Sequence, residues 1–109
     1  EASIWLYSMD MMAPRHELTI PKCHIDKCQI RHNYIWFNNQ YENSIIGVNL
    51  NDYNERVELK NPMINFPHGI EINYNGVMAV ANYKSESIFL FDLDSLLKKN
   101  TTIKQRSSS

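Results

Sequence analysis

A segment that begins Ser-Ile occurs three times along this chain, and this repeat restricts the possible folds more than any other feature. The copies are residues 3–10, 44–51 and 87–94, separated by 41 and then 43 positions. Such a period is typical of repeat proteins in which each unit is one supersecondary motif. Each copy continues as an apolar run, broken only at Gly47, and ends in Asp or Asn. The run predicts a β-strand that is buried on both faces.

Two further stretches repeat at almost the same spacing. Residues 15–18 (Arg-His-Glu-Leu) return 41 positions later as residues 56–59 (Arg-Val-Glu-Leu), and we interpret both as connectors between units. Residues 34–37 match residues 77–80 at a spacing of 43, and they predict the strand that precedes each later copy. Each unit therefore contains three or four short strands in about 42 residues.

Polar turn residues separate the predicted strands. Asn75 and Gly76 signal a hairpin between a strand at residues 70–74 and the strand that begins at Val77. Asn tolerates the left-handed backbone conformation that Gly usually adopts in turns. We therefore attribute the low Gly count, 3 in the whole chain, to Asn in the turns.

The predicted fold class is all-β, with antiparallel four-stranded sheets of the kind that form β-propeller blades. Residues 1–10 are expected to be the outer strand of a preceding blade. Residues 11–51 and 52–94 are each expected to contain a connector and one full blade. Residues 95–109 are expected to form a short helical turn, with Asp94 as its cap, and then a disordered polar tail.

Two and a half blades cannot close a ring, because propellers typically need four to eight. We therefore expect a fragment of a larger propeller, with the missing blades supplied by the rest of its chain or by other chains. The alternative is a homotrimer of two-blade chains that closes a six-bladed ring. In either case the isolated chain is expected to be sticky or oligomeric.

Composition excludes several classes of protein. With 11 Lys and Arg against 12 Asp and Glu, the net charge of -1 predicts no basic face for nucleic acid. No apolar run approaches the roughly 18 residues of a membrane span. The 43% of hydrophobic residues, including 11% aromatic, predict one ordered domain for most of the chain.

One blade of the chain resembles a known repeat. Residues 67–76, 80–83 and 87–92 contain Pro-x-Gly, Asn-Gly and Ala-Asn elements. Together they resemble the repeat of six- and seven-bladed propellers, which include NHL-repeat proteins, lactonase-type propellers and the gluconolactonase and paraoxonase group. Residues 23–50 resemble the same repeat loosely. These elements are shared by propellers of many functions, so the resemblance implies a fold and not one activity.

The resemblance also implies a ligand-binding face. In gluconolactonase-like propellers the residue between Pro and Gly often points to the central channel and binds a divalent metal, usually as Asn or Asp. Here that residue is His68, and imidazole suits zinc or other transition metals better than calcium. The family's blade geometry implies that His24, His68, Asn39 and Asn82 lie on one face, where propellers bind ligands.

Structural roles compete with ligand binding at all four positions. Each His can serve as a base or metal ligand, with Asp26 and Glu71 as neighbours that orient the imidazoles. Alternatively, each His caps a strand, and Asn39 and Asn82 are turn residues. Four aromatic residues suit stacking on sugars, but aromatic residues in strands usually belong to the core; they are Trp5, Tyr34, Trp36 and Phe37.

A zinc site near the first blade is a further alternative. Cys23, His24, Cys28 and His32 supply four donors within ten residues, the number and type that tetrahedral zinc needs. The spacing lacks the short Cys-x2-Cys knuckle, and residues an odd number apart in a strand point to opposite faces. The sequence therefore favours free thiols, with a disulfide between the two cysteines as a minor alternative.

The chain contains no nucleophile motif, Gly-rich phosphate loop or paired catalytic carboxylates. The leading hypothesis is therefore a non-enzymatic module that binds a protein, small-molecule or glycan partner and needs no cofactor. The alternative is a metal-assisted hydrolase or lactonase with His68 at the central channel, where a divalent metal would be required. A weaker alternative is a trimeric lectin-like propeller.

Overall fold

The computed structural model describes residues 1–8, 13–99 and 105–106. The described chain is mostly β-structure with one short helix, which confirms the predicted β character. None of its helices is long and apolar enough to cross a membrane. The elements, in chain order, are β1 (Ala2–Ser8), β2 (Ala13–Ile20), β3 (Cys28–Arg31), β4 (Tyr34–Asn39), β5 (Ser44–Asn49), β6 (Asp52–Lys60), β7 (Pro67–Ile72), β8 (Val77–Asn82), β9 (Ser87–Asp92), α1 (Leu93–Lys99) and β10 (Gln105–Arg106).

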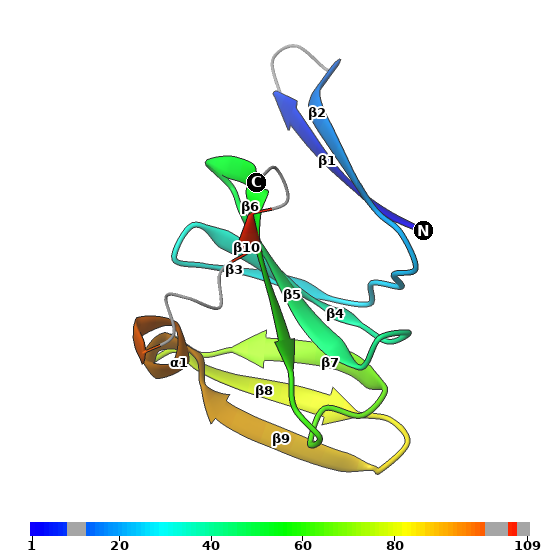
Figure 1. The fold of residues 1–109 in the computed structure, drawn as a ribbon, viewed down its shortest axis with the longest axis vertical. Helices are drawn as coiled ribbons and strands as arrows, with labels where there is room; N and C mark the ends of the chain where they lie inside the picture. Colours follow the sequence, from blue (N-terminus) through cyan, green and yellow to red (C-terminus); the bar gives the residue numbers. More distant parts are fainter. Residues whose placement is uncertain (9–12, 100–104, 107–109) are drawn as a thin grey trace.

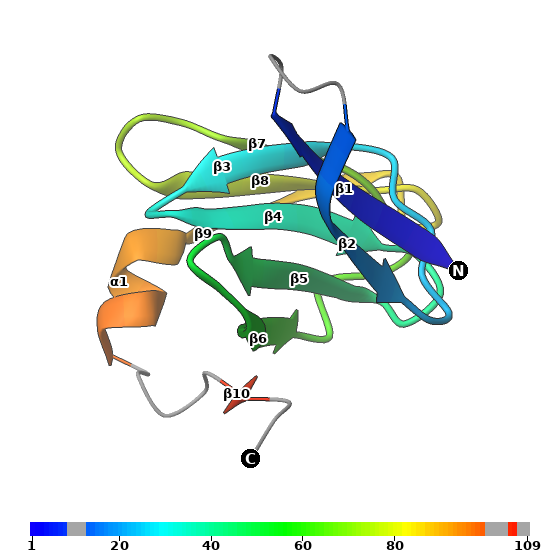
Figure 2. The ribbon, with the colours of Figure 1, turned by 90° about the horizontal axis from the view of Figure 1, so that it is seen from above.

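The strands form three antiparallel sheets. The N-terminal sheet is the hairpin β1-β2, the central sheet has the order β10-β6-β5-β4-β3, and the C-terminal sheet has the order β7-β8-β9. Figure 1 shows them from top to bottom in this order, with α1 beside the end of the two lower sheets. Figure 2 shows β1 and β2 crossing over the central sheet, and β10 beside β6.

The first six residues of each copy of the repeat lie in strands β1, β5 and β9. Ser44 pairs with Asn39 at the start of β5, and Ser87 pairs with Asn82 at the start of β9. The predicted hairpin at Gly76 is also present, with a positive φ of 85°. The repeat in the sequence is therefore a repeat of strand position, at least in the central and C-terminal sheets.

The two predicted connectors are strands instead. Residues 15–18 lie in β2 and residues 56–59 lie in β6, which pairs with the outer edge of β5. Charged and aliphatic residues alternate in the second stretch, and period-two alternation is the pattern of a half-buried strand. The expectation that the Ser-Ile copy is the outer strand of its unit is therefore wrong for β5, which lies between β4 and β6.

The end of the chain differs from the prediction in two details. The helix cap is Asp92, whose Oδ1 accepts a hydrogen bond from the Ser95 amide at 2.9 Å, whereas Asp94 was expected to cap. Gln105 and Arg106 form β10 and pair with β6. The remainder of the predicted disordered tail, residues 100–104 and 107–109, lies outside the described residues.

Residues other than Asn and Gly also adopt the left-handed backbone conformation in the turns. Asn33 and Asn43 adopt positive φ angles, as the Asn-rich turns predicted. Non-Gly residues that the sequence did not single out for this conformation adopt it as well: Lys22, His32, Phe66 and Glu86.

The central sheet is buried on both faces. Toward the N-terminal sheet it presents Phe37, Ile46 and Val48, which pack with Ile4 and Leu18. Toward the C-terminal sheet it presents a second set of buried side chains: Tyr34, Trp36, Ile45, Val57 and Leu59. Full burial of one such aliphatic or aromatic side chain contributes about 1.5–3 kcal/mol. These two layers of side chains therefore hold the three sheets together.

Trp36 and Gly47 explain the one interruption of the apolar run. The two residues pair directly across β4 and β5, and the Trp36 side chain is fully buried. A Cβ atom at Gly47 would lie 2.4 Å from the indole ring. Only Gly leaves the space that the indole fills.

Equivalent strand positions face the same way in each sheet. Ile4 packs toward the central sheet and Ile45 toward the C-terminal sheet. Ile88, the third member of this series, is 71% exposed, and its neighbour Leu90 on the same face is 62% exposed. No described residue covers this outer face of the C-terminal sheet. At the other end of the stack, Trp5 is half exposed on the outer face of the hairpin.

Gly47→Ala is expected to lower the free energy of unfolding by about 1–3 kcal/mol, since the added methyl group overpacks against a buried indole. Urea unfolding followed by Trp fluorescence measures this loss. Gly69→Ala is the matched control, because a Cβ there meets only the Lys27 side chain at 3.8 Å. Its effect should stay within about 0.5 kcal/mol, and equal losses for the two variants would contradict the packing argument.

Candidate functional site

His24 and Asp26 form a polar pair ahead of β3. The His24 Nε2 atom lies 3.2 Å from the Asp26 carboxylate, and the His24 side chain is half exposed. The imidazole also lies edge-on to the Tyr41 ring, with 6.1 Å between the ring centroids. The predicted role of Asp26 as the residue that orients His24 is therefore consistent with the geometry.

Asn38, which sequence analysis did not single out, holds this region together. Its fully buried side chain accepts hydrogen bonds from the Asp26 and Lys27 amides and donates to the Asp26 carboxylate. It also donates to the Pro67 carbonyl at 2.9 Å. One amide side chain thus links the loop before β3 to the first residue of β7. A polar residue directly after the apolar run of β4, beside Asn39, was the only signal available in the sequence.

Asn39 and Asn82 occupy equivalent positions but have different partners. Asn39 is buried, and its Oδ1 accepts from the Tyr41 amide, which makes a local turn. Asn82 is also buried; its Oδ1 accepts from the Asn65 amide at 2.9 Å and its Nδ2 donates to the Met63 carbonyl at 2.7 Å. The Asn82 side chain fixes the loop before β7, which is a structural role.

His68 lies on the exposed start of β7. Its ring is 5.7 Å from that of Tyr83. It lines an open depression of about 370 Å³ that also includes Ala81 and Ile88. Its predicted orienting neighbour Glu71 instead accepts a hydrogen bond from Gln29 at 2.7 Å and lies 3.9 Å from the Lys27 ammonium group. Of the two histidines, only His24 has a carboxylate partner, and among contacts between described residues none joins His24 to His68.

The four possible zinc ligands, Cys23, His24, Cys28 and His32, do not come together in the structure. Cys23 is buried in the core between the first two sheets, while Cys28 is exposed and both thiols are free. His32 lies at the far end of β3 and contacts Asp94. Among the described residues, no three His, Cys, Asp or Glu side chains form a group that could hold a metal ion.

Burial raises the pKa of the Cys23 thiol. Because the thiolate is the reactive form, a raised pKa makes this thiol a poor nucleophile near neutral pH. Cys23 is therefore a core residue and not a candidate catalytic group.

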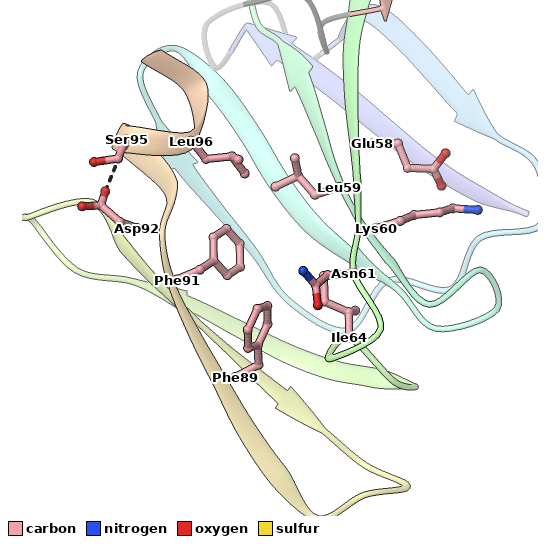
Figure 3. A pocket seen from close by; sticks show the side chains of 10 residues that line it. All are labelled: Glu58, Leu59, Lys60, Asn61, Ile64, Phe89, Phe91, Asp92, Ser95 and Leu96. Atoms are coloured by element: carbon pink, nitrogen blue, oxygen red, sulfur yellow. Dashed lines mark hydrogen bonds between the residues drawn. The ribbon is translucent and has the colours of Figure 1, made fainter. Parts of the chain in front are cut away.

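A cleft of about 490 Å³ lies between β6 and β9, closed at one end by α1 (Figure 3). Phe89 and Phe91 point into it from β9, and Leu59 points toward them from β6. Polar groups such as Glu58 and Lys60 lie at its rim. None of the four predicted ligand-binding residues lines this cleft. It is the main candidate site that the sequence did not indicate, because it forms only where two strands from different sheets meet.

A charged clamp holds α1 against the central sheet. The Asp94 carboxylate accepts hydrogen bonds from both Nε and Nη2 of Arg31, the Nε bond being 3.2 Å long. It also lies 2.8 Å from Nε2 of His32. The Arg31 guanidinium donates in addition to the Tyr74 carbonyl at 3.0 Å. The clamp thus joins β3, the hairpin after β7 and the first turn of α1.

Gly76 completes the clamp. Besides its positive φ, a Cβ atom at this position would lie 2.2 Å from the Asp94 carboxyl carbon. The hydrogen bond from the Arg31 guanidinium lowers the pKa of Asp94, and the same bond raises the pKa of Arg31. The ionised pair is therefore the stable state of the clamp at neutral pH.

Comparison with known proteins gave no match to a family model, to a curated protein or to a solved structure.

Asn82→Ala is expected to lower the free energy of unfolding by about 1–3 kcal/mol, because it removes the two hydrogen bonds that the buried Asn82 side chain makes with the Asn65 amide and the Met63 carbonyl. His68→Ala, at an exposed position, should stay within about 0.5 kcal/mol. Thermal and urea unfolding of both variants measures the difference. If Asn82→Ala is neutral, the assignment of this residue to the structure and not to a ligand is wrong.

Asp94→Asn is expected to destabilise the fold most above pH 5 and progressively less below about pH 4. The folded pKa of Asp94 is lowered, so its stabilisation is complete above the unfolded pKa and is lost as pH falls through the folded pKa. Urea unfolding between pH 2 and 7 follows this change. The difference in free energy of unfolding between the Asp94 and Asp94→Asn proteins should depend less on pH when Arg31 is also replaced by Gln. If this difference is constant with pH in the parent chain, the clamp is contradicted.

Proposed function

We propose that this chain is part of a β-propeller that acts as a non-enzymatic interaction module. The observation that carries the proposal is the stack of three sheets in which equivalent strand positions face the same direction. Ile4 and Ile45 are covered by the next sheet, while Ile88 is exposed. A stack of this kind supports a radial arrangement of blades.

The open face of the C-terminal sheet suits a further sheet of the same repeat. Ile88 and Leu90 pair across β8 and β9 with Ala81 and Ala79. The small Ala side chains beside the large Ile and Leu side chains leave hollows into which side chains of another sheet can pack. In the central sheet the equivalent pair is Gly47 and Trp36, which is buried under the neighbouring sheet. The occupant we propose is therefore a sheet that presents aromatic residues, as β1 does with Trp5 and Tyr7 on its outer face.

The polar residues favour binding over catalysis. Asn38 and Asn82 are engaged with loops, and the Asp94 carboxylate is engaged with Arg31. The two exposed histidines that sequence analysis selected lie beside tyrosine rings. Exposed imidazole and phenol groups suit recognition of a partner by hydrogen bonds and ring contacts.

The double variant Ile88→Lys/Leu90→Lys is expected to abolish self-association of the isolated chain, because two charges would be buried against the next sheet. Sedimentation velocity over a concentration series from about 1 to 100 μM, with expected dissociation constants in this range, measures the change. Circular dichroism confirms that the fold is retained.

The matched control is Tyr74→Lys, which adds a charge at a residue that is 86% exposed and lies in a turn. The control should self-associate like the parent chain. A parent chain that remains monomeric at every concentration, or a control that behaves like the double variant, would overturn the proposal for this face.

A further inference from the structure

The outer edge of β9 is open in the part of the chain that the structure describes. In the C-terminal sheet β9 pairs only with β8, so it is an edge strand. In the central sheet the equivalent strand, β5, carries β6 on that edge, and in the N-terminal sheet β1 carries β2. After β9 the chain continues as α1, Leu93–Lys99, in place of such a strand.

An open edge offers backbone donors and acceptors to another strand. Alternate residues of an antiparallel edge strand direct their N–H and C=O groups away from the sheet. β9 spans six residues, Ser87–Asp92, which is a usual length for a strand. An added strand would therefore find a full ladder of partners.

The cleft beside this edge supplies side-chain recognition. Phe89 and Phe91 are only half buried, and together with Leu59, Ile64 and Leu96 they give the cleft an apolar wall. Figure 3 shows these side chains turned toward one another across the gap between β6 and β9. The mixed charges at the rim come from Glu58, Lys60 and Asp92, residues that do not select one sign of charge.

We propose that β9 and this cleft bind an extended peptide strand that pairs antiparallel with β9 and carries aliphatic side chains at alternate positions. Backbone pairing provides affinity and the cleft selects the side chains, which is the physical basis of strand addition at a sheet edge. The repeat indicates the type of occupant: β6 alternates charged residues with Val57 and Leu59, and it fills the corresponding edge of the central sheet. This inference rests on the proposed function as an interaction module and assigns it a partner class.

The experiment uses a synthetic peptide with the sequence of residues 52–61, added to the isotope-labelled chain. It is carried out on the Ile88→Lys/Leu90→Lys variant, whose substitutions lie on the opposite face of β9 from the cleft. NMR amide shifts should change along β9 and at the start of α1, and hydrogen exchange of alternate β9 amides should slow. Sedimentation velocity of the same sample reports self-association separately. Peptide binding can therefore be measured even if the chain does not self-associate through the outer face at Ile88 and Leu90.

Two controls separate strand pairing from unspecific contact. A peptide that is N-methylated at alternate residues on its pairing edge should bind at least about tenfold more weakly, since it lacks donors. Leu96→Ser removes an apolar wall residue on α1 and should weaken binding by about tenfold, whereas Lys98→Ser on the same helix should not. Equal binding of the methylated peptide, shift changes confined to the other sheet edges, or no binding at about 1 mM would each overturn the inference.

Discussion

Burial of the central sheet on both faces is the constraint on which the rest of the structure depends. A sheet with two apolar faces is not stable in water until both are covered, because each exposed aliphatic or aromatic side chain forfeits its hydrophobic stabilisation. Here the hairpin β1-β2 covers one face and the C-terminal sheet with α1 covers the other. The packing of Trp36 over Gly47 shows how closely one of these layers is fitted.

The strand positions could be predicted from the sequence because period and side-chain type carry that information locally. The copies that begin at Ser3, Ser44 and Ser87 are strands, and the hairpin at Gly76 was recognised from its Asn-Gly pair. Strands β2 and β6 were missed because the charged residues at every second position in residues 15–18 and 56–59 were interpreted as polar connectors. An edge strand has this composition whenever one of its faces meets solvent.

The candidate site was harder to predict, for a physical reason. Asn82 and Asn39 are equivalent in the sequence, yet one fixes a distant loop and the other makes a local turn. Nothing in their spacing distinguishes these roles, because the partners are backbone groups whose positions depend on the fold. The cleft at Phe89 and Phe91 depends in the same way on how two sheets approach each other. The role of Asp94 depends on its contact with Arg31, which is 63 positions away in the sequence.

The two ends of the stack are different surfaces, and this difference determines the symmetry that any assembly of identical copies can have. The outer face at Trp5 and the outer face at Ile88 lie at opposite ends of the stack. Contact between the first face of one copy and the second face of another is therefore heterologous and leaves one face of each copy uncovered. Each added copy then presents a new uncovered face to which another copy can bind. Growth of this kind ends only if the rotation per copy brings the last one back to the first; otherwise the product is an open helical filament.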